Sequence, residues 1–334
     1  MTLRHFFFAA FLGLFPAAVL AADGEDLSSI MTQVRAGEYQ DAVATLSPLV
    51  EHGDADAQHL MGYLFENGFG VKRNLQRAVE LYVMAARGGQ ADAQFALGEL
   101  ALEGDGIEKS AKTAAGWYLL AAKQEHALAK LRLGVLYAEG NGVDRDRQKA
   151  LSYFEDAAIA GEPIAQRNLA IAYLSGDGVA QNIRKAAEWF ERAAANGDPV
   201  ANYNLGLLYQ SGRIGPPDLK ASTEKMRAGA EAGFAPAMVG LGLLLHESSE
   251  TDELPVDWFE RAAAAGDPQG RFLYAVSLAE SDGRPQDIAG AIAQLDVILA
   301  DKSLLDPEFR RQVNALKKSL LKELPKNRQA TNRN

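Results

Sequence analysis

The chain contains no cysteine among its 334 residues. This absence excludes thiol nucleophiles, disulfides, iron–sulfur clusters and thiolate zinc sites together. Histidine is also scarce, with five residues in the chain. None of them stands in the ligand spacing of a known zinc site or in a cluster with Ser and Asp, so neither a metal site nor a catalytic triad is indicated. The composition therefore predicts a protein without metal or cofactor.

Basic residues are in the minority, with 34 Lys and Arg against 44 Asp and Glu, and the formal net charge is -10. General nucleic-acid binding is disfavoured, because it needs a face rich in Lys and Arg. Hydrophobic residues make up 48% of the chain and charged residues 23%, the usual balance of a globular protein. These figures predict a chain that folds in water and has no nucleic acid as partner.

The N-terminus shows the three parts of a secretory signal peptide. A basic residue precedes the apolar run Phe6–Phe15, and small residues follow before an acidic stretch. The run is too short for a membrane span of roughly 20 residues, and Pro16 follows it directly. We expect residues 1–21 to be the signal peptide, with cleavage after Ala21 or Ala22 and a periplasmic or secreted mature protein without a membrane span. The alternative is an uncleaved N-terminal anchor.

A repeat with a period of 36 residues runs through the rest of the chain. A column of small residues and a column of large, mostly aromatic residues recur, and each column loses three residues at one step near the sixth repeat. The small column is Gly62, Gly98, Gly134, Ala170, Gly206, Gly242 and Ala275; the large column is Tyr82, Tyr118, Phe154, Phe190, Met226, Phe259 and Leu295.

These columns predict two packed helices in each repeat. The first helix carries a small residue where its axis approaches a neighbour closely, and the second presents a large side chain followed by paired alanines. Gly-x-Gly pairs such as Gly68 and Gly70 divide the two helices, because glycine suits the left-handed turn that ends a helix. Between repeats, Gly197-Asp198-Pro199 is typical of a helix end, an N-cap and a first-turn proline.

The segments Ala201–Tyr209 and Lys185–Asp198 resemble the Sel1-like repeat, a relative of the tetratricopeptide repeat. The resemblance covers seven units between residues 55 and 303. It implies an all-α fold, a right-handed α/α solenoid of helix-turn-helix repeats whose concave face is lined largely by the first helices. It also implies adaptor, assembly or regulatory roles rather than catalysis.

Shorter helical segments flank the repeats. Residues 22–54 are expected to form a helix pair, similar to a tetratricopeptide unit, that caps the N-terminal end. Asp306 and Pro307 are typical of an N-cap and a first-turn proline, and they predict a C-terminal capping helix within residues 304–325. Residues 326–334 are expected to be a disordered basic tail.

The concave face that the resemblance implies is the expected binding site. Two columns of the first helices face it, three residues before and one residue after the small column. Their members are mostly apolar, and an exposed apolar groove marks a protein or peptide site. The predicted partner-binding residues are His59, Tyr63, Phe95, Glu99, Leu131, Arg167, Tyr203, Val239 and Phe272, and the second column continues with Val135, Ile171, Leu207, Leu243 and Val276. The charges of Glu99 and Arg167 would set the orientation in which a partner binds. The alternative is that these side chains wedge between adjacent first helices and are buried.

Two Ser-x-x-Lys patterns, at Ser222 and Ser319, invite comparison with β-lactamases. Neither is accompanied by a Ser-Asp-Asn or Lys-Thr-Gly motif, and Ser222 falls on an ordinary second-helix position of the fifth repeat. The Gly-x-Gly pairs do not extend to a phosphate-binding Gly-x-Gly-x-x-Gly and follow no strand. A hydrolase of the β-lactamase type is therefore the least supported function.

Together with the resemblance, these features predict an exported, non-catalytic scaffold that binds a protein of the periplasm or cell envelope through its concave groove. The most specific form of this prediction, taken from exported Sel1-like proteins, is negative regulation of a two-component sensor kinase by binding its sensor domain. The alternative is a cell-envelope assembly factor for polysaccharide or peptidoglycan machinery.

Overall fold

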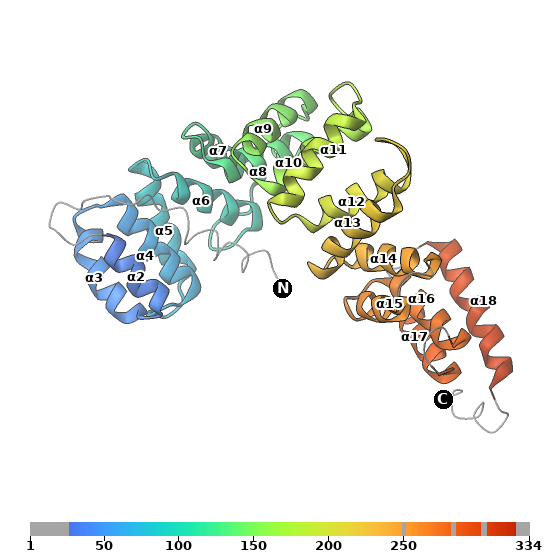
Figure 1. Ribbon diagram of the computed structural model, residues 1–334. Helices are drawn as coiled ribbons and strands as arrows, with labels where there is room; N and C mark the ends of the chain where they lie inside the picture. Colours follow the sequence, from blue (N-terminus) through green and yellow to red (C-terminus); the bar gives the residue numbers. More distant parts are fainter. Residues whose placement is uncertain (1–26, 249–251, 282–284, 302–305, 325–334) are drawn as a thin grey trace. The chain divides into compact units, whose positions relative to one another are not determined.

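The computed structural model describes residues 27–248, 252–281, 285–301 and 306–324, and every regular element in these ranges is an α-helix (Figure 1). The predicted signal peptide, the predicted basic tail and part of the irregular turn at residues 246–253 lie outside the described residues. The helices follow one another as pairs joined by turns, and each packs against its neighbours in the chain. This arrangement confirms the all-α, solenoid-type fold of helix-turn-helix repeats.

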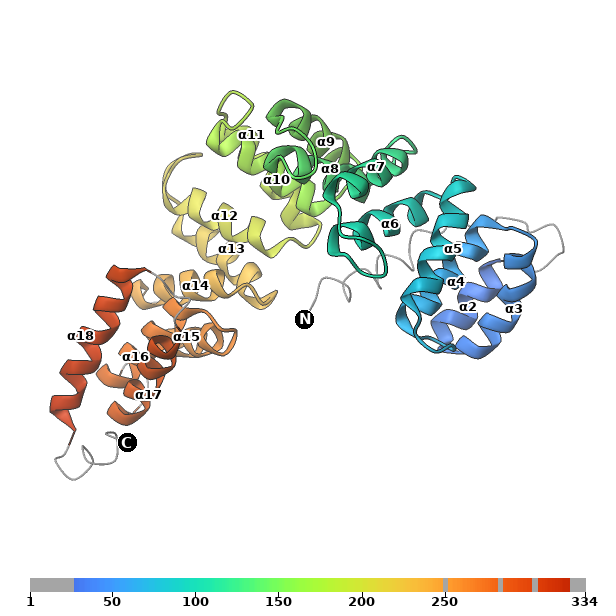
Figure 2. The ribbon, with the colours of Figure 1, turned by 180° about the vertical axis from the view of Figure 1, so that it is seen from behind.

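The chain divides into two compact units after Glu162, a position that the 36-residue pattern crosses without a break. Unit 1 contains α2 (Leu27–Ala36), α3 (Tyr39–Glu51), α4 (Ala55–Asn67), α5 (Leu75–Arg87), α6 (Ala91–Glu103), α7 (Ala111–Ala122), α8 (Ala127–Glu139) and α9 (Arg147–Ile159). Unit 2 contains α10 (Pro163–Ser175), α11 (Ile183–Ala195), α12 (Pro199–Gln210), α13 (Leu219–Glu231), α14 (Ala235–Glu247), α15 (Pro255–Ala264), α16 (Pro268–Glu280), α17 (Ile288–Ala300) and α18 (Pro307–Glu323). Figure 2 shows the same helices from behind.

Three of the first helices begin at an aspartate N-cap, of the kind that the sequence predicts at Asp198. The side chains of Asp54, Asp198 and Asp267 each accept a hydrogen bond from the backbone N–H three residues further on. Pro199 and Pro268 then occupy the first turn of α12 and α16, where no backbone donor is needed. Each such cap stabilises its helix by about 1 kcal/mol.

Glycines end the first helices of unit 1 at the first position of each Gly-x-Gly pair. Gly68, Gly104 and Gly140 have φ angles of 76°, 85° and 75°, a left-handed conformation that other residues rarely adopt. The second glycine has a different role in the third repeat. A Cβ at Gly142 would collide with the backbone of Ala111 at the start of α7, so this turn packs directly on the preceding repeat.

The small and large columns meet inside each repeat, as the sequence predicts. A Cβ added to the small residue would come within 3.0 Å of the large side chain in five pairs. These pairs are Gly62–Tyr82, Gly98–Tyr118, Gly134–Phe154, Gly206–Met226 and Gly242–Phe259. The first and second helices of these repeats therefore pack closely, because the large side chain of the second helix occupies the space that a Cβ of the glycine on the first helix would fill.

The three-residue shortening of the sixth repeat falls on its second helix. Helix α15 has 10 residues, whereas α13 and α17 have 13 each. Glu253, just before α15, accepts hydrogen bonds from the Arg227 guanidinium at 2.9 Å and from the indole N–H of Trp258 at 2.8 Å. The end of the irregular turn is thereby fastened to α13.

Helices also flank the repeats at both ends. Ile30, Val34 and Leu46 of the α2–α3 pair are buried in one core with the first repeat. At the other end, Val313 and Leu320 of α18 are buried in one core with helices α16 and α17. Each terminal helix therefore covers the apolar side of the repeat next to it.

Candidate functional site

The structure divides the nine predicted groove residues by exposure. His59, Leu131 and Val239 are buried, with exposed fractions of 2%, 5% and 7%, so these side chains present little surface to a partner. The half-buried ones are Tyr63, Phe95, Glu99, Arg167, Tyr203 and Phe272. Their part in binding stays a prediction.

Glu99 on α6 is held inside unit 1 by neighbouring side chains. Its carboxylate accepts two hydrogen bonds from Arg132 on α8, at 2.8 and 2.6 Å, and another from the hydroxyl of Tyr118. Burial and the adjacent carboxylate raise the pKa of Tyr118, so its hydroxyl remains a donor. Glu99 therefore joins two repeats, and its charge already has a counter-ion.

A row of polar side chains crosses the N-terminal ends of α6 and α8. Gln90 caps α6 and donates a hydrogen bond to Asp92 at 3.0 Å. Nδ1 of His126 accepts from the Ala129 N–H as the cap of α8, and Nε2 lies 3.1 Å from an Asp92 oxygen. Because Nδ1 is an acceptor, the neutral ring carries its proton on Nε2 and donates it to Asp92. His126 thus links two repeats through a structural hydrogen bond.

Two residues with side chains that catalytic and metal sites often use, His59 and Ser222, are both buried. Burial lowers the pKa of His59 to about 4, so its imidazole is neutral at pH 7. The hydroxyl of Ser222 is buried and donates to the Gly206 carbonyl at 2.9 Å, which leaves it unavailable as a nucleophile. Within the described ranges, no three His, Asp or Glu side chains gather as a metal site, and no helix has the length and apolarity to cross a membrane.

Arg167 on α10 is paired in unit 2. Its guanidinium donates to one oxygen of Asp198 at 2.6 Å, while the other oxygen accepts the Ala201 N–H at 2.7 Å. The Asp198 side chain is only 4% exposed. One carboxylate therefore both caps α12 and neutralises Arg167.

The aromatic groove residues of unit 2 also make internal contacts. Tyr203 meets Phe234 edge-on, with ring centroids 5.5 Å apart. Phe272 meets Phe309 of α18 in the same way at 5.7 Å. Both rings are therefore partly covered by other rings of the same unit.

Three of the exposed large apolar side chains on the first helices of unit 2 belong to the other column, one residue after the small one; Ile164, near the start of α10, is 40% exposed and lies outside it. Ile171, Leu207 and Leu243 are 43%, 39% and 40% exposed, and they occupy the same position on α10, α12 and α14. The half-buried Asn168 and Asn204 lie nearly one helical turn before the first two. We call these five residues the unit-2 face. The sequence contained this column, but its exposure became visible only in the structure.

A pocket of about 370 Å³ opens on the unit-2 face. Leu174 of α10, Asn204 and Leu207 of α12, and Arg213 beyond the end of α12 contribute to its lining. Two successive first helices therefore form one continuous depression with an aliphatic wall and an exposed leucine at its edge.

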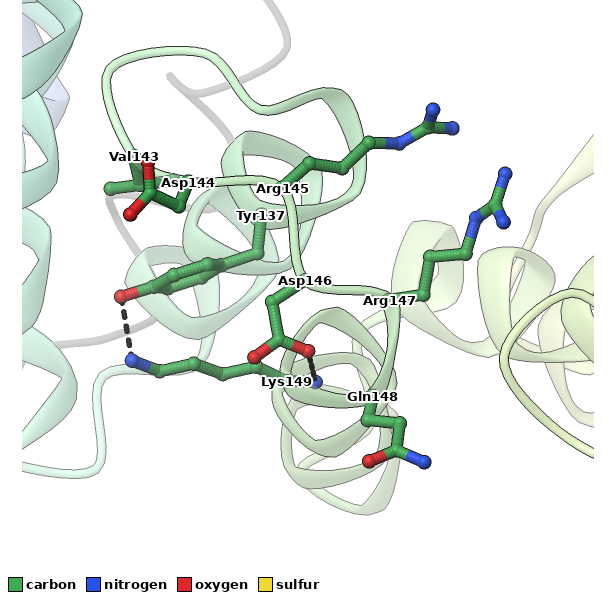
Figure 3. Close-up of a pocket in the computed structure, with 8 residues that line it drawn as sticks. All are labelled: Tyr137, Val143, Asp144, Arg145, Asp146, Arg147, Gln148 and Lys149. Atoms are coloured by element: carbon green, nitrogen blue, oxygen red, sulfur yellow. Dashed lines mark hydrogen bonds between the residues drawn. The ribbon is translucent and has the colours of Figure 1, made fainter.

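A second depression, of about 750 Å³, lies at the turn between α8 and α9 (Figure 3). The Lys149 ammonium donates to the Tyr137 hydroxyl at 2.7 Å, and Arg145 and Arg147 extend away from the tyrosine ring. Two acidic and three basic residues line the depression and stand next to one another along the turn, so it presents little net charge to a ligand. The unit-2 face is therefore the stronger candidate site.

The Sel1 repeat profile matches six segments of the chain, which together make up more than half of it. They are residues 55–90, 91–126, 127–162, 163–198, 199–224 and 235–267. The chain belongs to the Sel1 repeat family. Each match begins at the first residue of a first helix, as the helix pairs require. The helices α16 and α17, predicted as a seventh unit, lie beyond the matched segments.

Solved structures agree with this membership. A Sel1 repeat protein from Oxalobacter formigenes is 30% identical, with a TM-score of 0.65, and the alignment covers 70% of this chain and 95% of that one. A protective antigen of uropathogenic Escherichia coli strains with an SLR fold is 24% identical, with a TM-score of 0.56 and 78% of this chain covered. The chain spans 64% of that antigen's length, and the likeness shows the fold alone. No curated protein matches the sequence.

Sel1 repeat proteins are in general scaffolds for protein interactions, and their fold is in general not enzymatic. This membership accords with the exposed apolar column of unit 2.

Proposed function

We propose that this chain is an exported scaffold that binds a protein of the cell envelope through the unit-2 face. One observation carries the proposal: Ile171, Leu207 and Leu243, at the same position of three successive repeats, are each about 40% exposed. Aliphatic side chains that recur along one face of a solenoid form a continuous apolar surface, and such surfaces mark interaction sites. The family's general role as a scaffold supports the same function.

The finer form of the proposal is that the partner is the sensor domain of a two-component kinase, which the bound scaffold holds inactive. Exported relatives with this role motivate it, and the signal-peptide pattern of residues 1–21 supports export. A row of repeats suits such a task, because many modest contacts add up over a large area.

Substitution of the unit-2 face tests the binding. The variant carries Ile171→Gln, Leu207→Gln and Leu243→Gln, since glutamine retains helix propensity while it removes the apolar surface. A matched control carries Leu219→Gln, Leu254→Gln and Val297→Gln, at positions of unit 2 with exposures of 54%, 37% and 51%. Both variants and the wild type are used to capture partners from crosslinked cell envelopes. We expect one envelope protein to be retained by wild type and control and lost from the face variant. Equal retention by all three proteins would contradict the proposal.

Export and regulation need separate measurements. Mass spectrometry of the protein from cells is expected to show an N-terminus at Ala22 or Asp23; an intact Met1 would show that the segment is not cleaved. If the captured protein is a sensor kinase, deletion of the gene for this chain should raise kinase output, and the face variant should fail to restore repression. Capture of polysaccharide or peptidoglycan enzymes instead would assign the chain to envelope assembly.

A further inference from the structure

The unit-2 face differs from the corresponding surface of unit 1 in its charge. The equivalent positions on α6 and α8 include Glu99 and Arg132, whereas those of unit 2 hold aliphatic residues, asparagine and glycine. Helix α12 contains no charged residue, and the only ionised side chain of α10 is Arg167, which Asp198 already pairs. A chain with a net charge of -10 thus leaves one partly exposed surface almost without charge.

This lack of charge restricts what the face accepts. A charged side chain that docks on Ile171, Leu207 or Leu243 loses water, and these three residues offer it no counter-ion, which is unfavourable. An aliphatic side chain in the same place gains roughly 25 cal/mol for each Å² of apolar surface that it covers. Of the residues that line the pocket, only Arg213 is charged, and Glu247 lies in the last turn of α14. The segment that fits the face is therefore uncharged and aliphatic.

The two asparagines on the face decide between an extended and a helical segment. Asn204 donates to the Val200 carbonyl at 2.8 Å, and no hydrogen bond joins the Asn168 side chain to any described residue. A bound helix would cover these amides with side chains while its own backbone groups remain bonded internally. An extended segment offers backbone N–H and C=O groups that need partners. The amides therefore favour an extended peptide.

Helix spacing sets the register of such a peptide. Helices α12 and α14 are in contact, and packed helices lie about 8–10 Å apart. An extended chain with three residues per turn rises about 3.1 Å per residue, so it advances roughly 9 Å in three residues and returns the same face to the protein. Aliphatic residues at every third position then meet Leu207 and Leu243 in turn.

We infer that the unit-2 face binds an extended, uncharged segment of a protein that carries an aliphatic side chain at every third residue. The inference rests on the proposed function and names its ligand class. A protein segment is favoured over a glycan because the exposed side chains of the face are aliphatic, while Tyr203 packs on Phe234 and Lys185 covers the Tyr173 ring. It is favoured over a second copy of this chain because the described residues of a second copy would present helices, whose backbone groups are already hydrogen-bonded within each helix.

A random library of 12-residue peptides displayed on phage tests the inference with the full mature chain. Peptides are selected on wild type after removal of those that bind the face variant. We expect the selected pool to be depleted in Asp, Glu, Lys and Arg and enriched in Leu, Ile and Val at three-residue spacing. A synthetic peptide from this pool should bind the face variant at least about tenfold more weakly than wild type, and the control variant about as tightly as wild type. Its Kd should change less than about twofold between 50 and 500 mM NaCl, since no charge pair contributes.

Other outcomes overturn the inference. The selected peptides could be rich in charged residues, could carry Leu, Ile and Val without three-residue spacing, or could show no enrichment of any residue. A synthetic peptide that binds the face variant as tightly as wild type would also overturn it. A concentration-dependent dimer that only the face variant abolishes would assign the face to a second copy, and binding of chitohexaose that depends on the face would assign it to a glycan. If the envelope partner is still captured through the face while no peptide is selected, the proposed function stands and the peptide inference fails.

Discussion

Gly62 on α4 lies directly against the ring of Tyr82 on α5: a Cβ on Gly62 would stand 2.8 Å from two ring carbons. The ring is almost fully buried, and its hydroxyl donates to Glu66 of the same repeat at 2.8 Å. The tyrosine is therefore fixed at both ends, and it has little freedom to make room for a methyl group.

Gly62→Ala is expected to destabilise unit 1 by about 1–3 kcal/mol, because the added methyl group overlaps the Tyr82 ring, which has no space to move. In an unhindered helix the same change stabilises by about 1 kcal/mol. Gly116 of α7 provides that control, since no atom lies within 4 Å of a Cβ placed there. Hydrogen exchange of the α4 and α5 amides should accelerate in Gly62→Ala, whereas Gly116→Ala should leave α7 amides as protected as before or more so. Acceleration of the same size in both variants would contradict the packing.

Acid should destabilise unit 1 through His59. Burial lowers the pKa of His59 from 6.5 to about 4. As the pH falls, the imidazole therefore becomes protonated near pH 6.5 in the unfolded chain and only near pH 4 in the folded chain. Stability contributed by the neutral ring is complete above this window and is lost as the pH falls through it, by up to about 3 kcal/mol. Urea denaturation at several pH values measures the loss.

The substitution His59→Gln removes the titrating ring, and its stability should fall less than that of wild type between pH 6.5 and 4. His52→Gln, which replaces an exposed histidine of the same unit, is the control and should follow the wild-type profile. Parallel profiles for wild type and His59→Gln would show that the folded chain accepts the proton as readily as the unfolded one.

The Glu99–Arg132 pair should couple the second and third repeats. Its geometry is bidentate and its side chains are only 23% and 25% exposed, so a double-mutant cycle with Glu99→Gln and Arg132→Met should give a coupling energy of about 1–2 kcal/mol. The exposed pair Arg77–Glu80, on one helix, should give about 0.3 kcal/mol. A coupling for Glu99–Arg132 no larger than that of the exposed pair would contradict its role in joining repeats.

Asp198 should matter more than an ordinary N-cap, because it also pairs Arg167. Asp198→Ala removes the cap and leaves the guanidinium without its carboxylate, with an expected cost of about 2–4 kcal/mol. Asp198→Asn retains the cap and should cost about half as much. Asp218 caps α13 with a single bond to the Ala221 N–H at 2.9 Å, and Asp218→Ala should cost about 1 kcal/mol. Thermal unfolding of the full chain compares the three variants, and equal shifts for Asp198→Ala and Asp218→Ala would disprove the second role.

The periodic part of the fold was predictable because it depends on local rules. The distance from Gly62 to Gly98 and the Gly-Asp-Pro signals around Asp198 follow from helix length, turn chemistry and capping, all of which act within one repeat. The prediction that the chain has no metal site and no catalytic triad also depended on residue types and their spacing along the sequence. His126 shows the limit: its hydrogen bond to Asp92 depends on two helices of successive repeats meeting, which the repeat pattern alone does not show.

By itself, the sequence determined the helix pairs, their caps and the contact of each small residue with its large partner, because these are interactions between residues at constant separation. Only the tertiary structure decided that Val239 is buried while Leu243, on the same helix, is 40% exposed. The physical reason is that cores and binding faces both select apolar residues, so the pattern alone cannot separate them. Exposure depends on how closely each neighbouring helix approaches, and that distance is set by the packing of the unit as a whole.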